Sequence, residues 1–315
     1  MEGRQNSLQI DTTSPSLVPA KSIQRRSQTL PYIVLGGAFP VAAICNVVLP
    51  QFFINQQTLS TGSIVGYFLG GVLFAQIALL AIWAALGSQA AMIRFPTSAT
   101  LTMVLAGCYC VGMRTGFIYA LPVSIFILVS LAATYLAIQI PLLVYRRVTG
   151  QYIGYPEDAD SQPQYSVKQL MSVVAIIAAM FAFLRGIFAQ YSHVDFGGMM
   201  PDVFLVLAGL LVTVSLVICL PCIWIAFGRS PSEQIKPGVM LVLGLLIGPP
   251  VITGAVILVL KGRRIDLTEL IVDLYFISLG LAVATLSGLA TVRAIGMELL
   301  RPTKHEDAKK VESSL

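Results

Sequence analysis

Charged residues are scarce in this chain. Only 11% of its 315 residues are Asp, Glu, Lys or Arg, whereas hydrophobic residues make up 56%, and the mean hydropathy is +0.82. Soluble domains carry roughly 25% charged residues. The shortage of charge excludes an ordinary soluble domain and predicts an integral membrane protein whose first partner is the lipid bilayer.

Histidine and cysteine are also scarce, which leaves few groups for chemistry inside a membrane. The two histidines, His193 and His305, fall outside the long apolar stretches, so we expect no histidine-based metal site or proton relay within the bilayer. No apolar stretch carries a convincing cluster of ionisable side chains at one depth. We therefore expect no enzyme activity, no cofactor and no metal.

Long apolar stretches are what the chain has in abundance. A helix needs about 20 residues to cross the roughly 30 Å hydrocarbon layer, and these stretches are too long and too uniformly apolar for barrel strands. The sequence predicts an all-α, polytopic membrane helical bundle. Its eight predicted spans are residues 30–53, 63–86, 96–113, 117–145, 170–190, 201–227, 238–260 and 267–297. The third and fourth spans could form a tight hairpin or a partly re-entrant segment.

The positions of Lys and Arg predict the orientation of the spans, because positively charged loops stay in the cytoplasm. Of the 20 Lys and Arg residues, fifteen fall on the side that holds both termini and five on the other side. Three of these five, Lys261, Arg263 and Arg264, form a cluster that opposes the assignment. The count still favours cytoplasmic termini. The net charge of +5 then needs no nucleic-acid partner, since the cations lie beside anionic lipid.

This topology divides the chain into two membrane halves. Residues 1–29 are polar and without apolar periodicity, which is typical of a disordered tail. Residues 30–145 form the first half, 146–169 a cytoplasmic connector, 170–297 the second half and 298–315 a cytoplasmic tail.

Both tryptophans lie in similar contexts, which raises the possibility of a duplication. Trp83 and Trp224 are 141 residues apart, and each is preceded by Ile and followed four residues later by Gly. A 4+4 repeat of this kind keeps both halves in the same orientation, related by an axis along the membrane normal. The alternative is that interfacial Trp followed by Gly is simply how a span ends.

The second half opens with a segment that resembles a known sequence pattern. Tyr165, Ser166, Val167 and Lys168 lead directly into an apolar helix. This resembles the Phe-Ser-Leu-Arg-x-Leu-Leu segment that opens a membrane helix in uncharacterised multi-pass proteins of planctomycete bacteria. The resemblance departs at Tyr165, Val167 and Lys168. It implies a bacterial cytoplasmic (inner) membrane and no particular activity.

Cys219 and Cys222 have the CxxC spacing of redox and metal sites. Cys108 and Cys110 could supply further thiols, but the predicted topology places them at another depth, so a four-sulfur metal site is not expected. Cys219 and Cys222 remain a candidate thiol pair. The alternative is that both are small buried residues beside the proline kink at Pro221.

Glycine and proline patterns indicate close packing and kinks within the spans. Glycines at four-residue spacing lie at positions 62, 66 and 70, at 244 and 248, and, with Ala284 between them, at 280 and 288. Such faces let helices approach closely, within one chain or between copies. We expect Gly248-Pro249-Pro250 to interrupt the hydrogen-bond ladder of the seventh span. Broken helices of this kind are simple kinks in some proteins and ion or substrate sites in transporters.

The sharpest ionic feature is a candidate intramembrane ion pair. Arg185 lies near the outer end of the fifth span, Asp202 opens the sixth and Asp273 lies early in the eighth. A charge within the bilayer is costly without a partner, so we expect Arg185 to pair with Asp202 or Asp273. A structural pair, snorkelling to the interface, and a substrate or proton site all remain open.

The sequence favours a multi-pass membrane protein with a non-catalytic structural or interaction role. A small-solute transporter is the alternative that the kinks, glycine faces and possible duplication suggest. A thiol-based membrane oxidoreductase rests on Cys219 and Cys222 alone. A cavity lined by Asn46, Gln76 or Gln139 would favour transport, and a filled interior the structural role.

Overall fold

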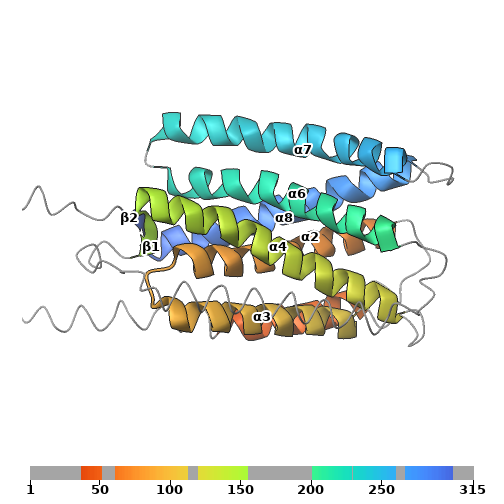
Figure 1. Ribbon diagram of the computed structural model, residues 1–315, viewed down its shortest axis with the longest axis horizontal. Helices are drawn as coiled ribbons and strands as arrows, with labels where there is room; N and C mark the ends of the chain where they lie inside the picture. The colour runs from red at the N-terminus through yellow and green to blue at the C-terminus, as the bar shows by residue number, and fades with distance from the viewer. Residues whose placement is uncertain are drawn as a thin grey trace, which may run out of the picture. The chain divides into compact units, whose positions relative to one another are not determined.

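The computed structural model describes residues 37–51, 61–112, 120–154, 201–228, 230–259 and 267–300. Six of the described helices are long and apolar enough to cross a membrane, and a shorter apolar helix covers Gly37–Gln51. The six are α2 (Thr61–Leu86), α3 (Ala91–Gly112), α4 (Ala120–Thr149), α6 (Pro201–Phe227), α7 (Pro231–Val259) and α8 (Leu267–Ala294) (Figure 1). This architecture is compatible with a multi-pass membrane protein.

The predicted spans agree best with α2 and α6. Two helices begin earlier than predicted: α3 at Ala91 rather than residue 96, and α7 at Pro231 rather than residue 238. The early part of each helix contains polar residues that the sequence prediction assigned to connectors: Arg94 in α3, and Glu233 and Gln234 in α7. The 22 residues of α3 rise about 33 Å, enough for a full crossing.

Two predicted spans stay partly or wholly untested. Only residues 37–51 of the predicted span 30–53 are described as a helix. The predicted span 170–190 lies outside the described residues, so the count of eight remains a prediction.

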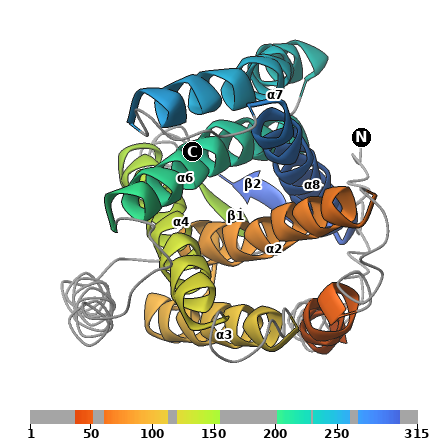
Figure 2. The ribbon, with the colours of Figure 1, turned by 90° about the vertical axis from the view of Figure 1, so that its right-hand side faces the viewer.

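Four helices form an inner group and two lie outside it. Helix α2 packs against α4 and α8, and α6 packs against the same two helices. Helix α3 lies against α2 and α4, whereas α7 lies against α6 and α8. Figure 2 shows the arrangement along the helix axes, with α3 and α7 on opposite outer sides. The core includes a row of buried alanines on α2, at positions 75, 78, 81, 84 and 85.

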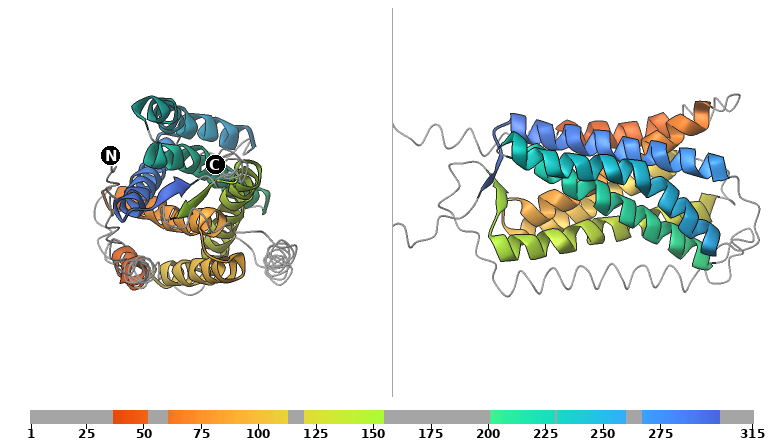
Figure 3. Two further views of the ribbon diagram at one scale, coloured as in Figure 1. Left: turned by 90° about the vertical axis from the view of Figure 1, so that its left-hand side faces the viewer. Right: turned by 90° about the horizontal axis from the view of Figure 1, so that it is seen from above.

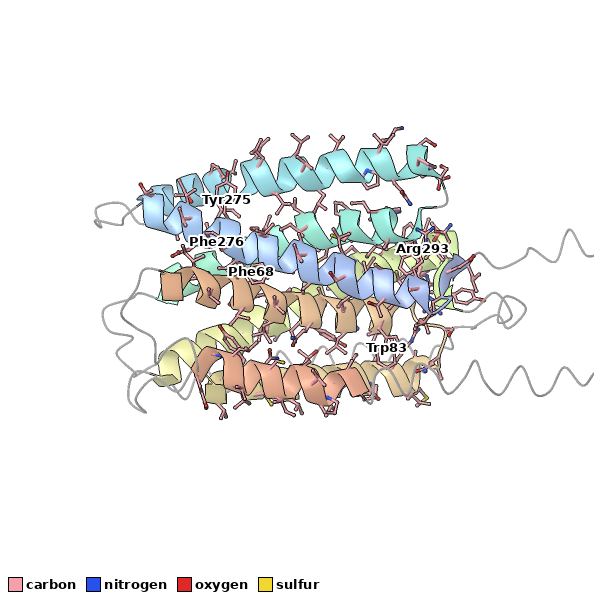
Figure 4. All side chains as sticks on the ribbon, turned by 180° about the vertical axis from the view of Figure 1, so that it is seen from behind. Phe68, Trp83, Tyr275, Phe276 and Arg293 are labelled. Carbon is pink, nitrogen blue, oxygen red and sulfur yellow. The ribbon has the colours of Figure 1, made fainter. Side chains whose placement is uncertain are left out.

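Helices α2 and α8 approach closely because two glycines face the opposite backbone. A Cβ atom at Gly71 would overlap the carbonyl oxygen of Ile277, and one at Gly280 would overlap the carbonyl oxygen of Phe68. Phe68 and Phe276 lie along this boundary in Figure 4. The predicted packing face at 280 and 288 is therefore used within the chain. The predicted face at 66 and 70 is used only in part: a Cβ at Gly66 would have no neighbour within 4 Å, whereas one at Gly70 would lie 3.8 Å from the hydroxyl of Tyr109 on α3.

Helix α7 continues through Gly248, Pro249 and Pro250, so the predicted interruption does not break the helix. Pro250 has no N–H to donate to the carbonyl oxygen of Leu246, four residues earlier. The hydroxyl of Tyr275 on α8 donates to this oxygen instead, at 2.7 Å. A side chain from the neighbouring helix thus replaces the missing backbone donor.

Two short strands, which the sequence analysis did not predict, follow α4 and α8 and pair with each other. Strand β1 (Tyr152–Gly154) pairs antiparallel with β2 (Glu298–Leu300), with Ile153 opposite Leu299. Gly150 and Gly296 precede them with φ values of 71° and 89°, a conformation that favours glycine. Figure 3 shows both strands at one end of the helices. Which side of a membrane this end of the helices faces stays a prediction.

Candidate functional site

The repeated Trp-containing segments form the ends of α2 and α6. The N–H of Gly87 donates to the carbonyl oxygen of Trp83 at 2.9 Å, and the N–H of Gly228 donates to that of Trp224 at 2.8 Å. The last carbonyl groups of a helix have no partner within the helix and carry the negative end of its dipole. Both helix ends therefore need donors from elsewhere.

At the end of α2 these donors come from two buried arginines. Arg146, near the end of α4, donates from Nη1 to the carbonyl oxygens of Ala85 at 2.9 Å and Gly87 at 2.8 Å. Arg94, in the first turn of α3, also donates to Gly87. The two side chains are only 3% and 1% exposed. The guanidinium of Arg146 also lies 5.8 Å from the ring centre of Tyr152 in β1, within cation–π range.

The end of α6 is built in a similar way. Arg293, near the end of α8, donates from Nη1 to the carbonyl oxygen of Ala226 at 2.6 Å. Gln234, in the first turns of α7, donates from Nε2 to that of Gly228 at 3.0 Å. Ala226 and Gly228 occupy the positions that Ala85 and Gly87 occupy in the first Trp segment. Figure 4 shows Arg293 and Trp83 at the same end of the helices.

This set of contacts can bind and orient but offers no general acid or base. A guanidinium group has hydrogen-bond donors and no acceptor, so Arg94, Arg146 and Arg293 act here as donors. Each of the three donates to a carbonyl oxygen at the end of another helix. What the arrangement does chemically is to tie the ends of neighbouring helices together.

The sequence analysis placed three polar side chains in a possible passage: Asn46, Gln76 and Gln139. Each of them forms a hydrogen bond with another side chain. Asn46 donates from Nδ2 to Oε1 of Gln76 at 2.8 Å, and the reverse contact is 3.5 Å long. Gln139 donates from Nε2 to the hydroxyl of Tyr135 at 3.1 Å, and that hydroxyl lies 2.5 Å from Oγ of Ser98. Asn46 and Gln139 are both buried.

Sequence reasoning missed several of these partners. Arg94, Arg146 and Arg293 were counted only as interfacial cations that set orientation. Their position within a turn of a span boundary, close to the Trp segments of neighbouring helices, is the signal that could have marked them as helix-end donors. Ser98 and Tyr135 carried no recognisable signal, because single hydroxyls in apolar helices are common.

The candidate thiol pair lies on α6 and is buried. Cys219 and Cys222 are free thiols with 0% exposure, and Sγ of Cys219 lies 3.9 Å from Oγ1 of Thr285 on α8. Within the described residues, no group of three or more His, Cys, Asp or Glu side chains could hold a metal ion. The redox role of the pair stays a prediction.

The candidate ion pair also stays a prediction. Arg185 lies outside the described residues, as does the side chain of Asp202 at the start of α6. Asp273 is half-buried on α8.

The chain matches no protein-family model, and neither the curated proteins nor the solved structures contain a significant match.

Proposed function

We propose that this chain is a non-catalytic integral membrane protein with a structural or interaction role, built from two repeated halves. The proposal rests on the hydrogen bonds that the polar side chains make to other parts of the protein. Carbonyl groups at helix ends accept hydrogen bonds from four side chains: Arg94, Arg146, Arg293 and Gln234. A further hydrogen bond, from Asn46 to Gln76, joins two helices. Groups that a catalyst or carrier would present to a substrate are occupied in holding the helices together.

The packing pattern supports the repeat. Exchanging α2 with α6, α3 with α7 and α4 with α8 turns every extensive helix contact into another one that is present: α2–α8 becomes α6–α4, and α2–α3 becomes α6–α7. The helix-end contacts exchange in the same way. Two equivalent strands that lie across a two-fold axis along the membrane normal meet antiparallel, which is how β1 and β2 pair.

The surface of α7 fits a lipid-facing element. It is the least buried of the six long helices, and its exposed side chains include Val239, Val242, Leu246 and Val251. In a bilayer such a face contacts acyl chains. The bacterial inner membrane, implied by the planctomycete resemblance, is the membrane we propose.

A small-solute transporter is the second candidate, because tandem repeats are common in transporters. The structural role is better supported by the direct bonds of Asn46 and Gln139 to other side chains, which leave less of each amide for a solute. A thiol-based oxidoreductase would require an electron acceptor to reach Cys219 and Cys222, which are buried.

Accessibility of the interior amides distinguishes the two candidates. We would place single cysteines at Asn46, Gln139 and Ser232 in a variant whose five native cysteines are replaced, and treat membrane vesicles of both orientations with a membrane-impermeant maleimide. Ser232 is exposed at the start of α7 and is the positive control. The structural role predicts labelling of Ser232→Cys alone. Labelling of Asn46→Cys or Gln139→Cys from either side would contradict it and favour transport.

A further inference from the structure

The short helix Gly37–Gln51 covers an outer face of the first half. Asn46 of this helix donates to Gln76 of α2 at 2.8 Å. A Cβ atom at Gly112, where α3 ends, would lie 2.5 Å from the carbonyl oxygen of Asn46 and 2.8 Å from that of Val47. The short helix therefore packs on α2 and α3 together, and Figure 2 shows it in orange-red beside α3.

The corresponding face of α6 is uncovered in the described part of the chain. The 141-residue offset between the Trp segments pairs Val72 of α2 with Thr213 of α6, and Gln76 with Val217. Val72 and Gln76 are half-buried, whereas Thr213 and Val217 are exposed. An added Cβ at Gly209, four residues before Thr213, would have no neighbour within 4 Å. Four-residue spacing places these three positions of α6 on one side of the helix.

Helix α7 borders this face of α6. A Cβ at Gly244 would lie 2.7 Å from Cγ1 of Val217. Successive residues are turned by about 100° around a helix, so Met240 and Ile247 lie on one side of Gly244 and Leu241 on the other. Leu241 is buried, whereas Met240 and Ile247 are 62% and 50% exposed. An apolar surface thus extends from α6 onto one side of α7.

Strand β1 and the start of α6 lie at opposite ends of the helices. Residue 153 of β1 forms a bridge with Gly87 at the end of α2. The end of α6 lies at the same end, because the ring of Trp224 packs against that of Tyr145 with 5.7 Å between their centres. The 27 residues of α6 rise about 40 Å, which places Pro201 at the other end. Residues 155–200 therefore connect the two ends.

One stretch of this connection is long and apolar enough to cross a bilayer as a helix, the predicted span 170–190. It lies outside the described residues. If it crosses, residues 191–200 link it to α6, just as residues 52–60 link the short helix Gly37–Gln51 to α2. Consecutive elements joined by short connections are usually neighbours in space.

The same offset also relates the two sides of the first-half contact to apolar residues. It pairs Asn46 with Ile187, in the predicted span, and Gln76 with Val217. Both members of the polar pair are thus apolar in the second half. The hydroxyl of Thr213 donates to the carbonyl oxygen of Gly209 at 2.8 Å, so this face of α6 offers a partner mainly apolar contacts.

We infer that the uncovered face of α6 is the docking surface for the span 170–190. The span packs there beside α7, as the short helix Gly37–Gln51 packs on α2 beside α3. Ile187 contacts Val217 in place of the hydrogen bond between Asn46 and Gln76. The inference rests on the repeat within the proposed function and deepens it, because it names the partner of this surface.

Cysteine cross-linking in native membranes tests the docking. We would pair Val217→Cys with Ile187→Cys in the cysteine-replaced background, add a protease site within residues 191–200, and treat with a short bifunctional thiol reagent. Asn46→Cys with Gln76→Cys is the positive control. Ala189→Cys with Val217→Cys is the matched negative control, because residue 189 lies about 200° around a helix from residue 187. We expect the first pair to cross-link several-fold more than this negative control.

A cross-link within one chain, which keeps the protease fragments joined until the link is reduced, supports the docking. A cross-link from Phe183→Cys instead of Ile187→Cys also supports it, with the span shifted by one turn. A dimer formed by Val217→Cys alone would show that a second copy covers this face and would overturn the inference. Failure of both span cysteines to cross-link, while the positive control succeeds, would overturn it in favour of lipid.

The outcome is separable from that of the proposed structural role. Maleimide labelling of Asn46→Cys or Gln139→Cys contradicts the structural role whether or not Ile187→Cys reaches Val217→Cys. Absence of the cross-link with an unlabelled interior leaves the structural role standing and removes only the docking of the span on α6.

Discussion

The side chain of Arg146, which belongs to α4, forms hydrogen bonds with the end of another helix, α2. Its guanidinium reaches from α4 to two carbonyl oxygens at the end of α2, where the helix dipole is negative. The same charge placed without partners inside a membrane protein would be strongly unfavourable. At the scale of single residues, burial of this arginine is therefore made possible by the free carbonyl groups that it faces.

We predict that Arg146→Met lowers the free energy of unfolding by about 1.5–3 kcal/mol, the usual range for hydrogen bonds to a charged group. Methionine keeps most of the apolar stem but removes the donors to Ala85 and Gly87. Arg147→Met, at an exposed neighbouring position, is the control and should change stability by less than about 0.5 kcal/mol. Denaturant unfolding in detergent measures both, and equal losses would show that the carbonyl contacts of Arg146 contribute nothing specific.

At the scale of elements, hydropathy predicts where spans lie but not how their ends are finished. The spans at α2 and α6 follow directly from long apolar stretches, because an apolar helix in a bilayer needs no partner to satisfy its backbone. The earlier starts of α3 and α7 were missed because polar residues such as Arg94 and Gln234 look like connectors. The β1–β2 pair was missed because three-residue strands far apart in sequence carry no periodic signal.

For the candidate site, the sequence identified the polar residues but not their hydrogen-bond partners. Asn46, Gln76 and Gln139 stand out in the sequence as polar residues in apolar helices. Their partners depend on which helices become neighbours, and this is a tertiary property. Glycine spacing has the same limit: the spaced glycine at position 66 faces open space, whereas Gly71, outside the spaced set, makes the close contact.

We predict that Gly71→Ala destabilises the protein by about 1–3 kcal/mol, the usual cost of overpacking. The added methyl group would overlap the backbone of α8 at Ile277, so the two helices must separate. Gly66→Ala, on the same helix but facing open space, should be neutral or stabilising by up to about 1 kcal/mol, because alanine favours the helical backbone. Thermal unfolding of both variants checks this. A similar loss in each would point to backbone flexibility rather than to the α2–α8 contact.

At the scale of the whole molecule, the distribution of positive charge indicates how the bundle is oriented in a membrane. The ends of α2, α4, α6 and α8 meet at one end, and Arg94, Arg146 and Arg293 all lie there. Positive charge concentrates on the cytoplasmic side of bacterial membrane proteins. We propose that this end is cytoplasmic, together with both termini.

Labelling of introduced cysteines tests this orientation. We predict that Ser7→Cys and Ser161→Cys, in the cysteine-replaced background, react with an impermeant maleimide only after the cells are opened. Their positions in the tail and connector place them on the side with more cations. A cysteine at Arg263, in the predicted external loop, should react in intact cells. Reaction of Ser7→Cys or Ser161→Cys from outside would reverse the orientation or remove a span.

The pairing of β1 with β2 also determines the order in which the molecule is completed. The partners Tyr152 and Leu300 are separated by almost half of the chain, so the ribosome makes β1 long before β2. Spans enter the membrane in order of synthesis. Strand β1, which follows α4, therefore cannot pair with β2 until α8 has been inserted. Closing this long loop is a late event with a large entropic cost. During synthesis, the first half must therefore persist in the membrane with Tyr152 and Ile153 not yet covered by β2, which makes this segment a natural point for chaperone protection or misassembly.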